Sequence, residues 1–409
     1  MVLYIYALCL TALALWLERD PAMTNPFQFG RELAPADLVD RDEEIVTCVR
    51  TIQQRERLFM IGPRRYGKTS ILRAASETVQ KEGAVVLRYN SEAYPTLEML
   101  VSRLLAEATE KLAGGYEKAS EKIKRFFASL RPEVTFNVSE RSWSAKVGVT
   151  TQTPGEQAQL LVEGLRGVNR LAGESAAVVG VILDEFQHVV ELGGENAEGQ
   201  FRAAVQEHQS LGYIFAGSKT RMLSDMTSNA ARPFYRLGSR MFIGPIPRQD
   251  FEGFVRRGFT RGGFEVGAGA AEAILDLAEE VPYNVQMLAH ACWNHLALSR
   301  RAVSLTPAVV NRVLETLVRQ DDPFYTQVWN TLTAAQQKAL LVLVKERGQN
   351  LYSARVIRES GMSQSTLQRA LTALNARDLV REEERRGETR LRLEDPFFGA
   401  WLILITRKS

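Results

Sequence analysis

The sequence predicts an α/β protein in which a parallel sheet alternates with helices, followed by a helical region and a small α+β domain. Three observations favour this class. A glycine-bounded run, Gly62 to Thr69, follows an apolar stretch and precedes a helical pattern. An unbroken apolar run from Val178 to Leu183 ends in two carboxylates. From Arg248 onward the patterns are helical, until a charged hairpin appears between Leu379 and Leu393.

The first run has the spacing G-x-x-x-x-G-K-[ST], in the order strand, loop and helix that this motif requires. Its glycines let the backbone wrap phosphate oxygens, and the helix N-terminus adds its positive dipole end. Lys68 is expected to reach the terminal phosphates, and the Thr69 hydroxyl to bind Mg²⁺. The alternative is a chance match in a surface turn. We predict a P-loop NTPase sheet with these nucleotide-binding residues: Gly62, Pro63, Arg64, Arg65, Tyr66, Gly67, Lys68, Thr69 and Ser70.

A P-loop NTPase also needs an acidic residue at the end of a buried strand. The β-branched run before Asp184 fits a parallel strand covered on both faces, so Asp184 should emerge at the carboxyl edge of the sheet. We predict that Asp184 holds Mg²⁺ together with Thr69. Glu185 is placed to orient and deprotonate an attacking water. The alternative is that both acids only cap the helix that follows.

The remaining elements of this domain follow in chain order. The acids after Leu38 predict the first turn of a helix, and the apolar runs that end near Tyr89, Ser218 and Pro245 predict strands. Helices are expected over Leu97 to Ala113, Gln157 to Leu171 and Glu198 to Gln209.

Two alternating segments, Val134 to Val138 and Trp143 to Val149, predict a β-hairpin inserted between the strands of the sheet. The hairpin is either a partner surface or a small structural flap.

The C-terminal half divides into two further regions. Four helices, Gln249–Arg261, Ala270–Glu280, Tyr283–Ser299 and Pro307–Arg319, predict a helical lid. The last region contains helices over Ala334–Glu346, Ala354–Gly361 and Ser363–Arg377, then strands over Leu379–Glu383 and Thr389–Leu393. Three helices and a hairpin describe a winged helix-turn-helix, with the recognition helix over Ser363–Arg377. The predicted domains are therefore 23–247, 248–322 and 323–409.

Composition bears on the partners and the cellular compartment of the protein. The chain has 409 residues with a formal net charge of +3, so a general attraction to nucleic acid is not required. Its three cysteines are far apart and suit a reducing cytoplasm. The uncharged stretch Val2 to Leu17 is short for a spanning helix. We expect residues 1–22 to reflect a start-site error, with Met23 as the true start and a cytoplasmic protein; the alternative is a membrane anchor.

These motifs together resemble the archaeal-type ATPase family, a branch of the STAND/AAA+ P-loop ATPases related to origin-recognition and signalling ATPases. The resemblance covers nearly the whole chain after Met23. The residues that carry it are Asn25-Pro-Phe-Gln-Phe-Gly30, Leu38-Val-Asp-Arg-Asp-Glu-Glu44, the P-loop with Arg64-Arg65-Tyr66, Ile182-Leu-Asp-Glu-Phe-Gln187, Asp395-Pro-Phe-Phe398 and Trp401.

The resemblance implies further site residues. It places Val39 and Arg41 against the adenine, and Ser218 where a sensor detects the γ-phosphate. The segment Arg232-Pro-Phe-Tyr-Arg236 resembles the one whose arginine approaches the γ-phosphate. The glycine that usually precedes that arginine is missing, so Arg236 and Arg240 are both candidates, and ordinary salt bridges are the alternative. Pro282 resembles a proline near the nucleotide in the lid, although Val281 replaces the usual glycine.

Three functional hypotheses follow. The leading one is a slow ATPase that uses ATP and Mg²⁺, whose nucleotide state repositions the winged-helix module. The second is an ATP-gated regulator that binds duplex DNA through Gln364, Ser365, Thr366, Gln368 and Arg369, with Arg385, Arg386 and Arg390 on phosphate. Acidic neighbours in the wing make a protein contact the alternative. The third is a transposition or defence ATPase that acts on a partner protein and forms a nucleotide-dependent oligomer.

Overall fold

The computed structural model describes residues 24–112, 134–137, 142–145, 153–194, 197–299, 304–385 and 388–406. They form two compact units. The sheet unit runs from Glu32 to Gly244, and the C-terminal unit combines the residues up to Arg31 with those from Pro245 onward.

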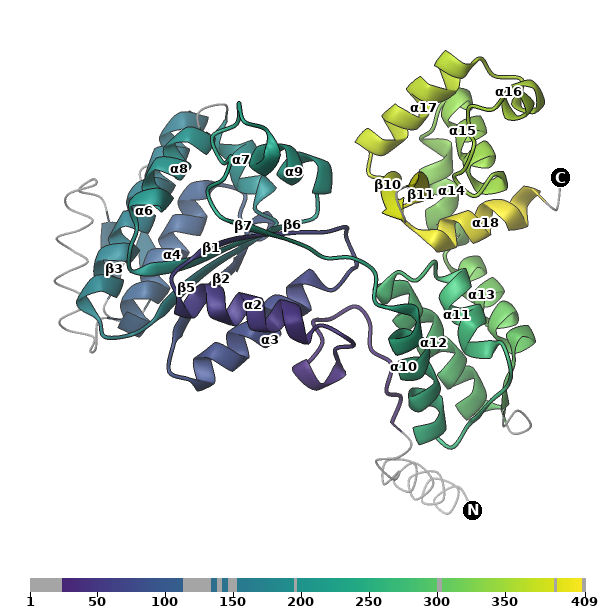
Figure 1. Ribbon diagram of the computed structural model, residues 1–409, viewed down its shortest axis with the longest axis horizontal. Helices are drawn as coiled ribbons and strands as arrows, with labels where there is room; N and C mark the ends of the chain where they lie inside the picture. Colours follow the sequence, from purple (N-terminus) through teal and green to yellow (C-terminus); the bar gives the residue numbers. More distant parts are fainter. Residues whose placement is uncertain are drawn as a thin grey trace, which may run out of the picture. The chain divides into compact units, whose positions relative to one another are not determined.

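A five-stranded parallel sheet forms the centre of the sheet unit (Figure 1). Its spatial order is β2-β5-β6-β1-β7, and all neighbouring strands are parallel. The strand β6, which ends before Ser218, therefore lies between β1 and β5. The bounds are β1 (Arg57–Ile61), β2 (Val85–Asn90), β5 (Val179–Asp184), β6 (Leu211–Gly217) and β7 (Ser239–Phe242).

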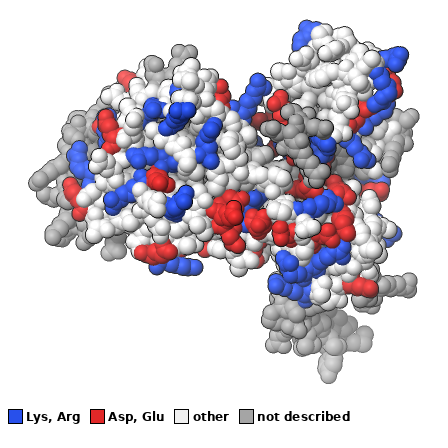
Figure 2. Space-filling view, in the orientation of Figure 1, with Lys and Arg blue, Asp and Glu red and all other residues white. Residues whose placement is uncertain are grey.

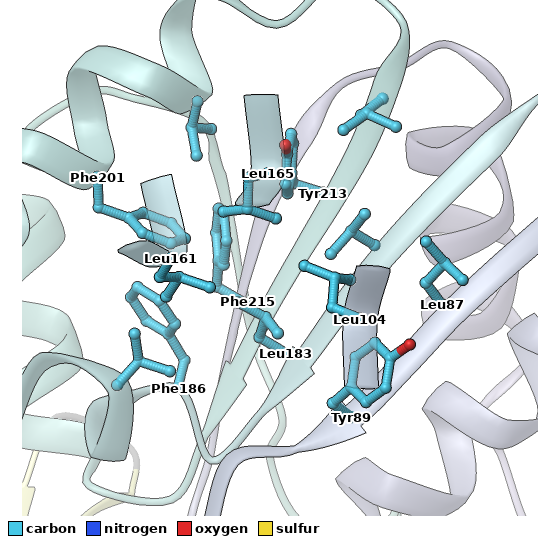
Figure 3. Packing of buried hydrophobic residues seen from close by; sticks show 14 of the residues in the cluster. Leu87, Tyr89, Leu104, Leu161, Leu165, Leu183, Phe186, Phe201, Tyr213 and Phe215 are labelled. Atoms are coloured by element: carbon cyan, nitrogen blue, oxygen red, sulfur yellow. The ribbon is translucent and has the colours of Figure 1, made fainter. Parts of the chain in front are cut away.

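Burial explains why the strands have continuous apolar sequences. Every residue of β5 and β6 is buried, as expected for parallel strands that helices cover on both faces. Side chains from one face of the sheet, including Tyr89, Leu183 and Phe215, pack against Leu104 and Leu161 of the helices above them (Figure 3). The opposite face is covered by the helix that contains Ile52, and a Cβ atom added at Gly180 or Gly212 would overlap Ile52.

Helices cover both faces of this sheet, with α2 and α3 on one side and α4, α6 and α8 on the other (Figure 1). Their bounds are α2 (Asp42–Gln53), α3 (Lys68–Lys81), α4 (Leu97–Leu112), α6 (Pro154–Glu174), α7 (Gln187–Gly193), α8 (Ala197–Glu207) and α9 (Thr220–Ser228), with short 3₁₀ turns η2 (Pro35–Asp37) and η3 (Ser91–Ala93). The predicted hairpin is confirmed, because β3 (Val134–Asn137) pairs antiparallel with β4 (Ser142–Ala145).

The C-terminal unit begins with a segment from the start of the chain. Phe27 is fully buried against Phe254 and Phe259 of α10, and its carbonyl oxygen lies 2.7 Å from His290 Nδ1 of α12. Asn25 Nδ2 donates to the carbonyl of His290 at 3.1 Å. The helical lid consists of α10 (Arg248–Arg261), α11 (Ala270–Leu277), α12 (Pro282–Leu298) and α13 (Pro307–Gln320), with β8 (Glu265–Val266) parallel to β9 (Ser304–Leu305).

The last region has the predicted winged arrangement of three helices and an antiparallel hairpin. Two helices that we did not predict flank it. The first, α14, begins next to a proline, and the last is an almost entirely apolar helix whose Trp401 donates to Asp322 at 2.7 Å. The bounds are α14 (Asp322–Asn330), α15 (Ala334–Lys345), α16 (Ala354–Ser360), α17 (Gln364–Ala376), β10 (Val380–Arg385), β11 (Glu388–Leu393) and α18 (Pro396–Thr406).

The turn between α11 and α12 contacts the wing. Glu279 and Glu280 in this turn have left-handed backbone angles, with φ of 50° and 58°. The Glu279 carboxylate lies 3.3 Å from the Arg392 guanidinium of β11 and forms an ion pair with it. Asn284 Nδ2 donates to Asp395 Oδ1 at 3.3 Å. The lid turn and the wing are thus joined by polar contacts inside one compact unit.

The predicted fold class is confirmed by these elements. The predicted domain boundaries stay predictions; the compact units place residues 24–31 with the lid rather than with the sheet. In the described ranges, no helix has both the length and the apolar character needed to cross a membrane. The stretch Val2 to Leu17, on which the start-site and anchor hypotheses depend, lies outside the described residues.

Candidate nucleotide-binding site

The predicted P-loop connects β1 to α3 at the carboxyl edge of the sheet. Gly67 directly precedes α3 with φ of 87°, a left-handed conformation that strains residues with a Cβ atom. This turn brings the backbone round so that the first turn of α3 begins at Lys68. The N–H groups of a first helical turn have no partner within the helix, so they are available to anionic oxygens.

Lys68 lies across this loop. Its ammonium group is buried and donates to the carbonyls of Gly62 at 2.9 Å and Pro63 at 3.0 Å. A cation held over the loop by two backbone carbonyls is poised to exchange them for phosphate oxygens, which are stronger acceptors.

Thr69 and Asp184 meet, although 115 residues separate them in the sequence. The Thr69 hydroxyl donates to Asp184 Oδ2 at 2.8 Å. One hydroxyl and one carboxylate oxygen at this spacing fit Mg²⁺, which takes a few protein oxygens and fills its remaining positions with water and phosphate. The predicted metal residues are therefore brought together, and their chemistry fits the ion.

Asp184 is buried at the end of β5. Burial raises the pKa of its carboxyl, and the nearby Glu185 charge adds to this, against the opposing effects of the Thr69 hydrogen bond and Lys68. A divalent cation would supply positive charge where burial now disfavours the ionised carboxylate.

Glu185 follows Asp184 with a left-handed φ of 50°. Its Oε2 atom accepts hydrogen bonds from the Ser218 amide at 3.0 Å and the Ser218 hydroxyl at 2.8 Å. Gln187 Nε2 donates to the same oxygen at 2.6 Å. Burial opposes ionisation, but the Lys68 charge and these hydrogen bonds from Gln187 and Ser218 together lower the pKa of Glu185. These contacts favour the ionised carboxylate.

The other predicted P-loop residues have different surroundings. Arg64 extends towards the end of β6, with Nε 3.4 Å from Ser218 Oγ and Nη2 3.2 Å from Glu92 Oε1. Tyr66 is buried in the core, and Arg65 is exposed with φ of 68°. The buried Ser70 hydroxyl accepts from the backbone amide of Leu33 at 3.0 Å. Of these side chains, Arg64 contacts Ser218 at the end of β6, next to Glu185.

The segment that the resemblance places near the adenine lies beside the start of the P-loop. Arg41 is buried, and its guanidinium donates to Glu44 at 2.8 Å and to the Gly244 carbonyl at 2.7 Å. The Ile243 amide in turn donates to the carbonyl of Ile61, the last residue of β1, at 2.7 Å. Val39 is half-buried two residues away. Arg41 therefore anchors the end of the sheet unit, and adenine contact by Val39 and Arg41 stays a prediction.

The candidate arginines of the sheet unit have partners away from the phosphate loop. Arg232 pairs with Glu198 and Asp225, which is the salt-bridge alternative for this segment. Arg240 donates to Ser228 and is paired in register with Phe59, in the middle of β1. Arg236 has φ of 56°, and its guanidinium carbon lies 5.1 Å from the Tyr235 ring centre. A phosphate-contacting role for Arg236 or Arg240 stays a prediction.

The remaining predicted residues belong to the C-terminal unit. Pro282 is the first residue of α12, directly after the strained turn. The predicted DNA-contacting residues lie on α17, where Gln364, Ser365, Gln368 and Arg369 are exposed and Thr366 is half-buried. Arg386 and the side chain of Arg385 lie outside the described residues. Nucleotide contact by Pro282 and DNA contact by α17 stay predictions.

Comparison with solved structures decides the fold. The Walker-type ATPase PABY2304 of Pyrococcus abyssi matches with a TM-score of 0.59 at 17% identity, covering 92% of this chain and 99% of that one. The chain has the fold of a Walker-type ATPase. A family model described as a probable winged helix domain matches residues 323–403. The Walker-type fold and its C-terminal winged helix, both predicted from the motifs, are therefore confirmed.

More distant matches to this Walker-type ATPase fold also span nearly the whole chain. The Aeropyrum pernix ORC1 protein in complex with DNA matches at 12% identity and a TM-score of 0.47, covering 93% of this chain and 96% of that one. The Thermotoga maritima RuvB Holliday junction branch migration motor matches at 11% identity and a TM-score of 0.43, covering 89% and 96%. Among the curated proteins, none matches this sequence.

Two residues of the Walker-type site were missing from the sequence-based set. Gln187 contacts the predicted base, and Glu92 pairs with Arg64. Gln187 stands two residues after Glu185, so its closeness in sequence was visible, but the direction of its side chain was not. Glu92 lies in η3 beyond the end of β2, and only the strand order brings that edge to the site.

Proposed function

We propose that this protein binds and hydrolyses Mg²⁺·ATP. The observation that carries the proposal is the 2.8 Å hydrogen bond between Thr69 and Asp184, because it joins the phosphate loop to the acidic strand end in the manner a metal–triphosphate site needs. The Walker-type fold supports the same conclusion.

The chain's own residues divide the work as follows. The turn before α3 and the first N–H groups of that helix bind the phosphates, and Lys68 supplies a positive charge there. Thr69 and Asp184 hold the metal, which when bound neutralises charge on the phosphates. Glu185 accepts the proton of the attacking water. Because Arg64 already lies 3.4 Å from Ser218, it can add a planar donor beside the terminal phosphate.

We also propose that nucleotide occupancy acts as a switch on the C-terminal unit. Its support is the lid turn, since Pro282, the residue expected near the nucleotide, is next to the turn whose Glu279 pairs with Arg392 of the wing. Glu279 and Glu280 are held in a left-handed backbone conformation that costs energy. A change in the contacts of this turn could therefore release the strain and alter its backbone conformation. The wing would then respond to the nucleotide through the lid.

Two variants test the ATPase proposal. Lys68→Ala should weaken Mg²⁺·ATP binding about 10- to 150-fold, since charge-assisted hydrogen bonds contribute about 1.5–3 kcal/mol. Lys81→Ala, at the exposed end of the same helix, is the matched control and should bind normally. Glu185→Gln should keep ATP binding but slow hydrolysis about 100- to 10,000-fold. Isothermal titration and phosphate release measure the two quantities, and unchanged turnover in Glu185→Gln would remove Glu185 as the base.

The second candidate function is an ATP-gated DNA-binding regulator. It is favoured by the winged-helix match and by the exposed polar residues on α17. The wing provides less support for DNA binding, because two of its arginines are already paired with carboxylates: Arg381 with Glu394, and Arg392 with Glu279 and Glu383. On the face of the winged-helix domain seen in Figure 2, the described Lys and Arg residues are scattered and form no continuous patch. Binding to a random duplex across a salt series tests the idea, since phosphate contacts require a steep salt dependence.

A further inference from the structure

Gln187 is a buried polar residue with no role in the phosphate or metal binding proposed above. It is the first residue of α7, is 1% exposed, and directs its amide nitrogen to Glu185 Oε2 at 2.6 Å. The same nitrogen lies 3.5 Å from the Ser218 hydroxyl. A side chain buried in this position either fills space or serves the carboxylate beside it.

The hydrogen bonds on Glu185 are distributed unequally. Gln187 and both donors of Ser218 converge on Oε2. Among the described residues, no donor contacts Oε1. One carboxylate oxygen is therefore fixed by three donors, and the other is left to accept a proton.

The packing around Gln187 fixes which way its amide faces. Its Oε1 atom is buried without a partner among the described residues and lies against Gly217, the last residue of β6. Turning the amide over would place that oxygen against the Glu185 carboxylate, and two acceptors repel each other. A buried amide oxygen without a partner lowers the stability of the protein. The hydrogen bond from Gln187 Nε2 to Glu185 is thus made at the expense of an unsatisfied oxygen.

We propose that Gln187 is a positioning residue for hydrolysis. With Ser218 it holds Glu185 Oε2 so that Oε1 faces the attacking water. In the step, the water oxygen bonds to the γ-phosphorus and the bond from that phosphorus to the bridging oxygen breaks. ADP leaves with the bonding electrons, and the water proton passes to Oε1. This inference rests on the proposed ATPase function, and it adds the residue that orients the base.

The test compares Gln187→Met with Gln200→Met in the full-length protein. Methionine keeps the length of glutamine and removes the donor. Gln200 of α8 is a matched control, because its amide oxygen is also buried without a partner among the described residues and none of its hydrogen bonds involves Glu185. Gln187→Met should lower kcat about 10- to 100-fold, since small misplacements of a catalytic group carry losses of that size. The Kd for Mg²⁺·ATP should change less than about twofold, and Gln200→Met should leave both values unchanged.

A double-mutant cycle separates positioning from a structural role. If Gln187 acts through Glu185, adding Gln187→Met to Glu185→Gln should lower kcat no further. If the losses multiply, or if kcat of Gln187→Met equals that of the wild type, the inference is wrong. Gln187→Leu, which also removes the donor without adding a charge, gives the same reading should the methionine variant fail to fold. Normal turnover by Glu185→Gln alone would instead remove the proposed base, and the inference with it.

Discussion

Replacing Gly217 by alanine probes the packing on which the Gln187 inference depends. Gly217 ends β6, a central strand, and its carbonyl accepts from the Gly62 amide at 3.4 Å. A methyl group at this position would overlap Gln187 Oε1 and the Leu223 side chain, both of which are buried. The strand has little freedom to move away, because β1 pairs with it up to Gly217 and the neighbouring Ala216 carbonyl accepts from Phe186.

The expected cost follows from this overlap. Inserting one carbon into a well-packed core typically destabilises a protein by about 1–3 kcal/mol. This is a large part of the total stability of a domain, about 5–15 kcal/mol. For a unit of roughly 200 residues, each kcal/mol lowers Tm by about 2–4 °C. We therefore expect Gly217→Ala to lower Tm by several degrees. The methyl group also pushes the Gln187 amide from Glu185, so kcat should fall in parallel.

Urea and thermal unfolding followed by circular dichroism measure the loss of stability. Gly199→Ala is the matched control, because Gly199 lies in α8 with no atom close to an added Cβ. Alanine there should stabilise the helix by about 0.5–1 kcal/mol. If Gly217→Ala were as stable as the wild type and kept its kcat, the space beside Gln187 would be larger than the structure shows, and the positioning argument would fail.

Three further predictions concern other parts of the molecule. Phe27→Ala should destabilise the C-terminal unit by about 3–5 kcal/mol, because the ring is fully buried between Phe254 and Phe259; an unchanged urea midpoint would contradict this packing. Arg392→Met should cost about 1–3 kcal/mol by leaving the Glu279 carboxylate unpaired, and adding Glu279→Gln should recover part of the loss in a double-mutant cycle. Burial and the charges of Arg166 and Arg57 lower the pKa of His208 from 6.5 to about 4, so protonation favours the unfolded chain. The His208 contribution is complete above pH 6.5 and is lost as the pH falls towards about 4; urea midpoints at the two ends should differ less in His208→Gln than in the wild type.

Much of the sheet unit could be predicted because its chemistry is local. The P-loop requires its glycines and Lys68 at fixed spacing, and an apolar strand that ends in Asp184 has few other uses. The strand order could not be predicted, because β5 and β6 are both continuous apolar runs and nothing in such a run specifies its neighbour. The pairing of Glu185 with Ser218 depends on that order, since it places the end of β6 next to β5.

The C-terminal unit shows a different limit. The run from Phe397 to Ile405 is so uniformly apolar that it has no helical period, so α18 gave no amphipathic signal. Phe27 lies in a segment without regular structure, far from α10 in sequence. The sequence around an apolar loop residue does not indicate which element it packs against. The arginines after Arg232 show the same problem for charges, because a guanidinium that pairs with Glu198 and one that binds phosphate look alike in a sequence.

The division of the chain into two compact units determines which fragments should fold when expressed alone. A fragment that starts at Pro245 contains the lid and the winged helix, yet it lacks the piece of its own interior that Phe27 and Asn25 provide. Such a fragment should expose Phe254 and Phe259, the side chains of α10 that pack on Phe27, and be prone to aggregation. Fusing residues 24–31 ahead of Pro245 through a flexible linker, or supplying them as a separate peptide, should restore the packing on α10. A fragment from Glu32 to Gly244 should need no such addition, because its compact unit is one continuous stretch of chain.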